Sequence, residues 1–166
     1  MVADLKQAYE ACKRITKAEA KNFYYAFRTL PADKRQAIYA AYAYCRLCDD
    51  IADADEDMPS TDKEARFYAL RVDLDSALAG NSDDPVLTAL ADSANRFGFS
   101  RELLLEVLEG VEMDLTKTRF ADFGELREYC YKVASAVGLI SIEVFGYENL
   151  AARDYAVDLG LAMQLT

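Results

Sequence analysis

The acidic stretch from position 49 to position 57 contains the side chains best suited to chemistry in this chain. Six of its nine residues are acidic, at positions 49, 50, 53, 55, 56 and 57. Tyr42, Asp49 and Asp53 share one helical face, because residues four or seven positions apart lie on the same side of a helix. Two carboxylates one turn apart, with Cβ atoms roughly 6 Å from each other, can share a hard divalent cation. The spacing of Asp49 and Asp53 therefore predicts a metal site at the end of this helix.

A solvated helix end is the simplest alternative for this acidic run, because runs of like charge usually face water. Two features favour the metal site. The acids continue an apolar stripe, where an unpaired carboxylate is costly. They also lie near the C-terminal end of a helix, where the macrodipole disfavours negative charge by roughly 0.3–1 kcal/mol. We therefore expect a cation to stabilise them.

The chain contains no histidine, which excludes Ser-His-Asp and Cys-His catalysis and His-ligated zinc. Cys45 and Cys48 form a C-x-x-C motif inside a helical pattern. Cys12 and Cys130 provide no second motif of this kind, so a four-thiolate zinc site is not expected. We interpret the four cysteines as reduced residues that pack between helices. Carboxylate, tyrosine and cationic side chains remain as the candidates for catalysis.

The composition is typical of one globular domain over residues 1–166. The chain is 52% hydrophobic, which is enough to bury a sizeable core. Acidic residues outnumber basic ones by 29 to 19, and the net charge of −10 argues against a nucleic-acid partner. No apolar run resembles a signal peptide or a membrane span. We expect a cytoplasmic protein that can contact a membrane surface peripherally, and the sequence leaves its oligomeric state open.

Helical spacing and cap residues predict helices along the whole chain and no strand, so the expected fold class is all-α. One helical pattern covers residues 5–27, and a second helix opens after Pro31 and carries the acids. A capping box from Thr61 to Glu64 begins the next helix, and Asp84 and Ser100 begin the two after it.

Two later helices would position further candidates. The helix that begins at Ser100 carries Asp114 at the edge of its apolar stripe, as a second inward acid. A capping box from Asp122 to Glu125 begins a long helix, whose predicted buried stripe is Leu126, Tyr129, Val133, Val137, Ile140 and Val144. Small residues at 134–136 and 138 indicate either tight helix packing or one wall of a ligand cavity. The last helix carries Val157, Leu161 and Leu165 and reaches Thr166 without a stop signal, so we expect it to be truncated.

Three stretches together resemble the squalene and phytoene synthase family. They are Tyr42 to Asp53, which contains the aspartate-rich sequence DDIAD, then Tyr129 to Val144, and then Leu159 to Thr166. The segment Phe23 to Phe27 and the following Leu30-Pro31 fit the same pattern. The family often has serines just before the position of Phe23, where this chain has Ala-Lys-Asn. Its second aspartate-rich motif would lie beyond Thr166.

The resemblance implies an all-α, isoprenoid-synthase-type helical bundle around a central cavity, truncated here before that second motif. It implies a transferase that condenses two farnesyl or geranylgeranyl diphosphates head-to-head to squalene, presqualene diphosphate or phytoene in terpenoid, carotenoid or hopanoid biosynthesis. The implied cofactor is Mg²⁺, with NADPH in addition if squalene is the product. Because the second motif is missing, the chain as printed is expected to be inactive.

The resemblance also implies site residues. The metal ligands would be Asp49, Asp50 and Asp53. The catalytic residues would be Asp49, Asp53, Tyr42, Arg46, Tyr129 and Asp114. The substrate-binding residues would be Phe23, Arg46, Val133, Val137, Gly138 and Gln164, with Arg46 on diphosphate oxygens.

A calcium-binding loop is an alternative for part of the same stretch. Asp53, Asp55, Asp57 and Glu64 match EF-hand ligand positions between two helical patterns. Met58 stands where that loop needs glycine for its sharp turn. The EF-hand interpretation is therefore the weaker one, and it predicts Ca²⁺ binding without any diphosphate.

Overall fold

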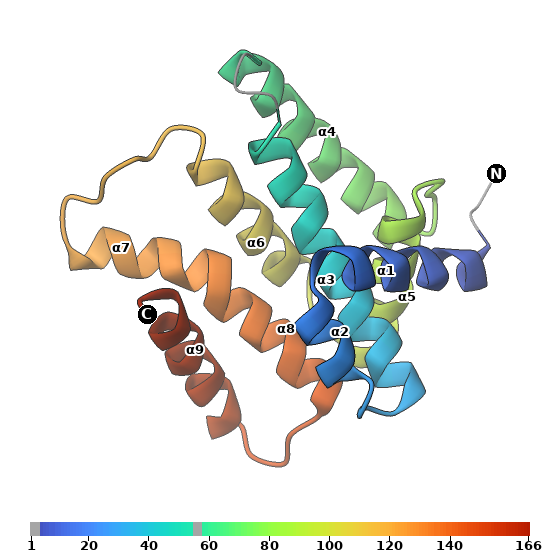
Figure 1. The fold of residues 1–166 in the computed structure, drawn as a ribbon. Coiled ribbons are helices and arrows are strands. Elements are labelled where there is room, and N and C mark those ends of the chain that lie inside the picture. Colours follow the sequence, from blue (N-terminus) through green and yellow to red (C-terminus); the bar gives the residue numbers. More distant parts are fainter. Residues whose placement is uncertain (1–3, 55–57) are drawn as a thin grey trace. The chain divides into compact units, whose positions relative to one another are not determined.

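The computed structural model describes residues 4–54 and 58–166. These residues form helices joined by loops and contain no strand (Figure 1). The helices are α1 (Leu5–Glu19), α2 (Lys21–Phe27), α3 (Ala32–Ala52), α4 (Ser60–Leu78), α5 (Pro85–Phe97), α6 (Arg101–Met113), α7 (Phe123–Cys130), η1 (Tyr131–Ser135), α8 (Ala136–Phe145) and α9 (Ala151–Gln164). This architecture confirms the predicted all-α fold class.

The chain folds into two compact units. The first contains Met1–Leu47 and Leu70–Gly98, and the second contains Cys48–Ala69 and Phe99–Thr166. Helices α3 and α4 contribute residues to both units. That residues 1–166 form a single domain stays a prediction.

In the first unit, α1 packs along α5 and is followed by α2. Asp84 caps α5 as predicted, since its carboxylate accepts a hydrogen bond from the amide of Leu87 at 2.9 Å. The single helical stretch predicted over residues 5–27 is wrong, because the backbone leaves the helical region at Ala20, where φ is −137° and ψ is 65°. The polar residues around this break bury almost no side chain, so packing does not hold the helix continuous there.

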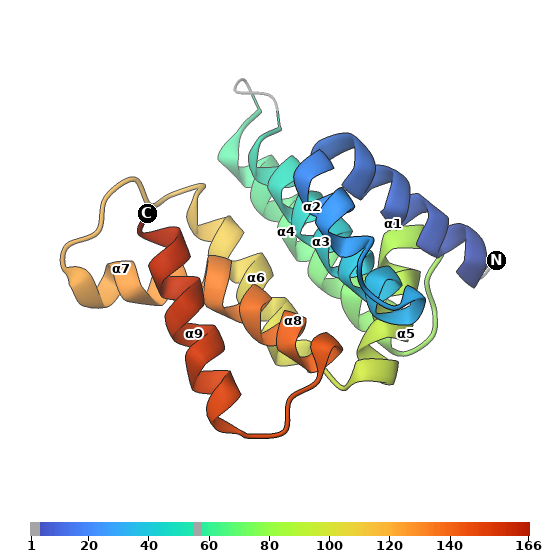
Figure 2. The same cartoon turned by 60° about the horizontal axis from the view of Figure 1, so that its bottom comes forward.

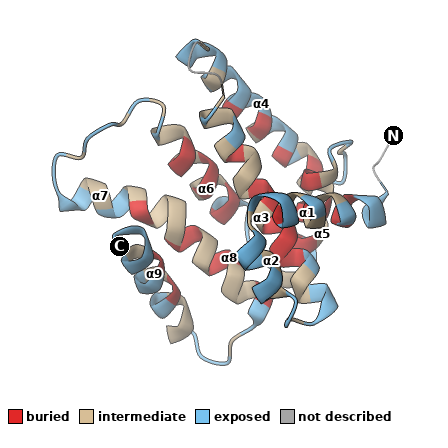
Figure 3. Ribbon diagram, in the orientation of Figure 1, coloured by how far each residue is buried: buried red, intermediate tan, exposed pale blue. Residues whose placement is uncertain are grey.

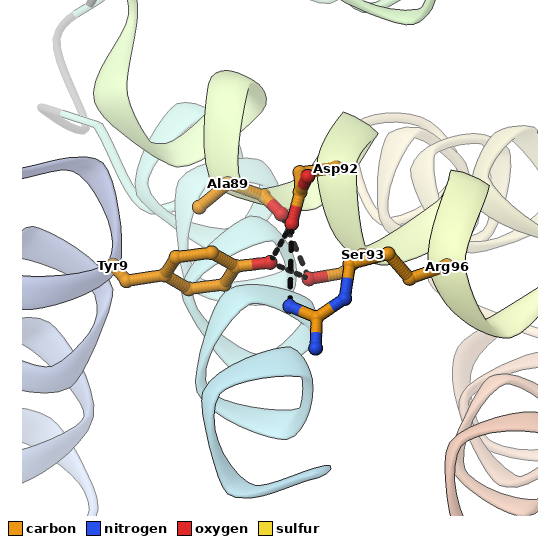
Figure 4. A network of polar contacts seen from close by, with 5 residues as sticks. All are labelled: Tyr9, Ala89, Asp92, Ser93 and Arg96. Carbon is orange, nitrogen blue, oxygen red and sulfur yellow. Dashed lines mark hydrogen bonds and ion pairs between the residues drawn. The ribbon is translucent and has the colours of Figure 1, made fainter. Parts of the chain in front are cut away.

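Tyr9 anchors α1 to α5 through a hydrogen-bond network (Figure 4). Its hydroxyl lies 2.5 Å from Asp92 Oδ2 and 2.9 Å from Ser93 Oγ. Ser93 Oγ also donates to the carbonyl of Ala89 at 2.8 Å, and Arg96 Nη1 lies 3.4 Å from Asp92 Oδ2. Burial and the contact with Asp92 raise the pKa of Tyr9 to about 12. The network therefore holds two helices that are far apart in sequence.

Replacing Tyr9 by Phe will lower the free energy of unfolding by about 1–2 kcal/mol, because a buried pair of hydrogen bonds is lost while the ring stays. The raised pKa means that the hydroxyl stabilises the fold fully below pH 10 and ceases to do so as the pH rises towards about 12. Urea denaturation at pH 7 and at pH 11 measures both effects. Tyr68→Phe, at an exposed position, is the matched control, and an equal loss in both variants would contradict the role given to Tyr9.

In the second unit, α7 continues through the π-helical turn η1 into α8, and this long helix packs against both α6 and α9. Figures 1 and 2 show α9 running beside α8 after the loop that joins them. Buried side chains lie along α6 and α8 (Figure 3), and include Leu104, Val107, Leu108, Leu139, Ile140 and Val144. Among the described residues, no helix combines the length and apolar character needed to cross a membrane.

The stripe predicted to be buried along the long helix is correct only in its second half. Ile140 and Val144 are buried, but Tyr129, Val133 and Val137 are only partly covered. For Tyr129 and Val133 the reason is the π-helical turn at Tyr131–Ser135, which inserts one extra residue into the helix and so shifts the buried face.

Two of the predicted helix starts are confirmed in this unit and one is wrong. Ser100 Oγ accepts from the amide of Leu103, and Asp122 Oδ1 accepts from the amide of Glu125 at 3.0 Å. The capping box at Thr61 is wrong because α4 already begins at Ser60, so Thr61 lies inside the first turn. The carbonyl of Pro59 accepts the first helical bond there.

Candidate functional site

The acidic end of α3 lies near the surface of the second unit. Asp49 is half-buried, and Asp53, just past the end of the helix, is exposed. The amide of Asp53 donates to the carbonyl of Asp49 at 2.7 Å, so the two acids are one helical turn apart, as predicted. The prediction that they continue a buried stripe is wrong. The fully buried face of α3 carries Tyr44 and Cys48 instead, because carboxylates are stabilised by contact with water.

Asp114 and Tyr129 form a hydrogen-bonded pair in the same unit. Asp114 follows the last residue of α6, and Tyr129 lies near the end of α7. The Tyr129 hydroxyl donates to the Asp114 carboxylate, and burial together with this bond raises the pKa of Tyr129 to about 12. The phenol therefore stays protonated at neutral pH and can act as a hydrogen-bond donor.

The pair lies within electrostatic reach of the acids on α3. Partial burial raises the pKa of Asp114, and the charge of Asp53 raises it further. The charge of Asp49 contributes in the same way to the raised pKa of Tyr129. We call Asp49, Asp53, Asp114 and Tyr129 the acidic cluster. The structure thus brings together four predicted site residues from α3, from the end of α6 and from α7.

The acidic cluster suits a hard cation that brings oxygen ligands of its own. Within residues 4–54 and 58–166, no three carboxylate or thiolate groups stand close enough to hold a metal ion by themselves. Mg²⁺ is commonly bound by one or two carboxylates together with phosphate oxygens of a substrate. Burial is the main reason why the pKa of Asp114 is raised, and the charge of Asp53 adds to it; a cation bound nearby would favour the charged form of both acids. The residues present therefore fit Mg²⁺ held jointly with a phosphorylated ligand, with Asp49 and Asp53 as protein ligands and exposed Asp50 beside them.

Phe120 is a residue of this site that the sequence analysis missed. Its ring centroid lies 5.1 Å from that of Tyr129, at an interplanar angle of 40°. Lys117 Nζ lies 5.4 Å from the Phe120 ring and 3.5 Å from Glu125 Oε2. The loop between α6 and α7 is thereby packed onto Tyr129. A loop has no helical periodicity, so the only signal in the sequence was an aromatic residue two positions before the Asp122 cap.

The other predicted site residues are distributed over both units. Phe23, Tyr42 and Arg46 belong to the first unit, where Phe23 stacks on Phe27 with centroids 5.9 Å apart. Val133, Val137, Gly138 and Gln164 belong to the second. Gly138 faces α9, since a Cβ on it would lie 3.1 Å from the carbonyl oxygen of Ala156. Gln164 is exposed at the end of α9.

Small residues at 135 and 136 confirm the packing interpretation for part of the long helix. Ser135 and Ala136 are fully buried, whereas Ala134 is only partly covered. All four cysteines are free thiols, and Cys12, Cys48 and Cys130 are buried, as expected for packing residues.

The described part of the predicted calcium loop does not favour a calcium site. Asp55 and Asp57 lie outside the described residues. Lys63 Nζ donates to the carbonyl of Ala52 at 2.7 Å, so an ammonium group already neutralises the helix end beside Asp53. Nothing in the described geometry supports the EF-hand alternative.

Comparisons with known proteins identify relatives along nearly the whole chain. A phytoene synthase of Mycobacterium tuberculosis is 40% identical over 165 residues, which cover 99% of this chain and 53% of the relative. A 4,4'-diapophytoene synthase of Staphylococcus haemolyticus is 34% identical over 166 residues, 99% of this chain and 58% of the relative. The chain thus spans about half the length of these curated relatives.

Solved structures and a family model agree with these relatives. A dehydrosqualene synthase in complex with a ligand superposes with a TM-score of 0.84 at 33% identity, over 97% of this chain and 55% of that one. A squalene synthase from Alicyclobacillus acidocaldarius gives a TM-score of 0.87 at 27% identity, over 97% and 60%. The model of the family described as squalene/phytoene synthase matches residues 16–166. The chain therefore belongs to the squalene/phytoene synthase family.

Proposed function

We propose that this protein is a Mg²⁺-dependent prenyltransferase that condenses two prenyl diphosphates head-to-head. The observation that carries the proposal is the acidic cluster, in which Asp49 and Asp53, one turn apart at the end of α3, lie within electrostatic reach of the hydrogen-bonded Asp114 and Tyr129. Family membership gives the reaction class. The farnesyl or geranylgeranyl chain, the product and any use of NADPH are further parts of the proposal that the acidic cluster does not select.

Each residue of the acidic cluster has a role that follows from its chemistry. Asp49 and Asp53 would be the protein ligands of Mg²⁺, which would supply positive charge to neutralise the diphosphate leaving group. Tyr129 keeps its proton, because its pKa is about 12, and donates it to the Asp114 carboxylate, so its hydroxyl oxygen is left as an acceptor beside the reacting centre. Asp114 accepts from Tyr129 and so fixes the direction of the phenol.

The apolar part of the substrate needs a wall that shields an allylic cation from water. Val133 and Val137 are only partly covered by the protein, although they lie in a helix that is otherwise packed on two sides. We assign this partly covered face to the prenyl chain. Apolar and aromatic side chains exclude water, and aromatic faces also attract cations.

Product analysis tests the proposal most directly. The protein, extended by a second aspartate-rich segment, is incubated with Mg²⁺ and either farnesyl or geranylgeranyl diphosphate, with and without NADPH, and the lipid extract is separated by chromatography. We expect a C30 or C40 hydrocarbon, or presqualene diphosphate. Binding of Ca²⁺ in the absence of diphosphate, with no consumption of either prenyl diphosphate, would instead favour the EF-hand alternative.

The 166-residue chain should be compared in this assay with a version extended by a second aspartate-rich segment. The described carboxylates do not form a complete metal site on their own, so we expect little turnover from residues 1–166 alone. Equal turnover in both proteins would contradict this part of the proposal.

Ala134→Phe will reduce turnover of geranylgeranyl diphosphate more than that of farnesyl diphosphate. Ala134 is partly covered, so a larger side chain there can extend along the proposed prenyl wall and shorten it. The ratio of kcat/KM values for the two substrates measures this effect. Equal losses for both substrates would remove Ala134 from the wall.

A further inference from the structure

The π-helical turn η1 lies at a place where two neighbouring helices both present glycine. On α6, a Cβ added to Gly110 would lie 2.7 Å from Lys132 Cβ and 2.9 Å from Val133 Cγ1. On α9, a Cβ added to Gly160 would lie 2.6 Å from Ser135 Cα and 2.7 Å from its backbone nitrogen. Real Cβ atoms do not approach other atoms so closely. The two helices can therefore contact η1 only because both positions are glycine.

Polar contacts fasten the same turn to the same two helices. Lys132 Nζ lies 2.5 Å from Glu106 Oε2 and 2.9 Å from Glu109 Oε2, both on α6. Ser135 Oγ donates to the carbonyl of Val157 on α9 at 2.8 Å. The π-helical turn is thus held from both sides by packing and by polar contacts.

Burial along the long helix shows what the extra residue does. Cys130 and Ser135 are both buried although they are five positions apart, while Ala136, Ile140 and Val144 follow at the usual spacing of four. In an uninterrupted α-helix, Ala134 would take the place of Ser135 beneath Cys130, a difference of about 100° about the helix axis. The backbone hydrogen bond from the Ala136 amide to the Tyr131 carbonyl belongs to this wider turn.

We propose that Gly110 and Gly160 are positioning residues that hold residues 131–135 in the π-helical form, and thereby set the angle between Tyr129 and the face that carries Val137. This inference deepens the proposed function and rests on it, because it concerns how the donor of the acidic cluster is aligned with the wall for the prenyl chain. Neither glycine contacts substrate in this assignment. Both act through η1, and a side chain at either position would force η1 away from its helix neighbour or back to the narrower α-helix.

The test uses Gly110→Ala and Gly160→Ala in the version extended by a second aspartate-rich segment, with Val144→Ala as the matched control. Val144 is buried on the same long helix, beyond η1, so its replacement lowers stability without crowding the π-helical turn. Amide hydrogen exchange of residues 131–137, thermal unfolding, kcat, and the affinity for inorganic diphosphate with Mg²⁺ are measured for each protein.

We expect each glycine variant to lose at least tenfold protection at the Ala136 amide and at least tenfold in kcat, with diphosphate affinity changed less than twofold. The control should keep the protection of the Ala136 amide, and its kcat should change less than threefold. We expect this even if its melting temperature falls as much as those of the glycine variants. The added methyl of Gly110→Ala would crowd two side-chain atoms and one backbone atom of η1, so this variant is the milder one. If Gly160→Ala does not fold, Gly110→Ala alone tests whether glycine holds the π-helical turn.

Two results would overturn the inference. One is unchanged Ala136 protection in a folded glycine variant. The other is a loss of kcat that follows melting temperature equally in the control. If the extended protein without substitutions converts no prenyl diphosphate, the proposed function fails, and the exchange data still decide whether the glycines hold the π-helical turn.

Discussion

In a version extended by a second aspartate-rich segment, Asp49→Asn and Asp53→Asn will each lower turnover of a prenyl diphosphate by about 100-fold or more, because removal of one preorganised electrostatic contact to a leaving group has effects of this size. Asn keeps the shape of the side chain but removes the negative charge that a divalent cation requires. Asp53 is exposed and Asp49 is half-buried near the surface, so neither change disturbs the core. The helix content measured by circular dichroism should stay nearly unchanged while product formation is lost.

Asp62→Asn is the matched control for these variants. It removes the same charge from the first turn of α4, in a residue that has no role in the acidic cluster. We expect its turnover to stay within twofold of the unmodified protein. If Asp49→Asn or Asp53→Asn keeps most of the original turnover at saturating Mg²⁺, the assignment of these acids as metal ligands is wrong.

Helix starts could be predicted from the sequence where a cap residue bonds to its own first turn. Asp84, Ser100 and Asp122 each do so in the structure, because this interaction depends only on residues close in sequence. Thr61 failed because a competing start one residue earlier uses the Pro59 carbonyl.

The π-helical turn could not be predicted in the same way. Its stabilising contacts come from Gly110 and Gly160, which are more than twenty positions away from the turn they contact. A period of 3.6 residues applied to the long helix therefore assigned Tyr129 and Val133 to the buried stripe. Their partial exposure became visible only when the packing of α6 and α9 was known.

In the candidate site, too, contacts between residues close in sequence could be predicted, whereas contacts between residues far apart in sequence could not. The pairing of Asp49 with Asp53 follows from their spacing of one helical turn. The resemblance to the squalene and phytoene synthase family indicated Asp114 and Tyr129 as catalytic residues. The sequence had no means of indicating that Phe120 packs on Tyr129, since that contact depends on the path of a loop. The degree of burial of the acids also had to come from the structure.

Asp114→Asn will lower turnover by about 100-fold or more, as expected for loss of a preorganised polar group at the reacting centre, and will raise thermal stability at neutral pH. The pKa of Asp114 is raised above its ordinary value of 3.8, first by burial and then by the charge of Asp53. Folding therefore favours the protonated acid. The protonated Asp114 stabilises the fold fully when the pH is below the ordinary pKa of 3.8. This stabilisation is lost as the pH rises through the raised pKa of the folded state. At higher pH the ionised Asp114 destabilises the fold, because its negative charge is partly buried. Asn carries no charge and so avoids this destabilisation.

Thermal unfolding of the metal-free protein between pH 4 and pH 7 checks the sign of this effect. The melting temperature of Asp114→Asn should exceed that of the unmodified protein at pH 7, and the difference should shrink towards pH 4. Tyr129→Phe is the complementary variant, because it removes the hydrogen bond that lowers the pKa of Asp114 and so shifts the same transition to higher pH. It should lose activity without gaining stability at pH 7. A stability gain in Tyr129→Phe, or a stability loss in Asp114→Asn at pH 7, would show that Asp114 is stabilised by its surroundings as a carboxylate, contrary to the role proposed for it.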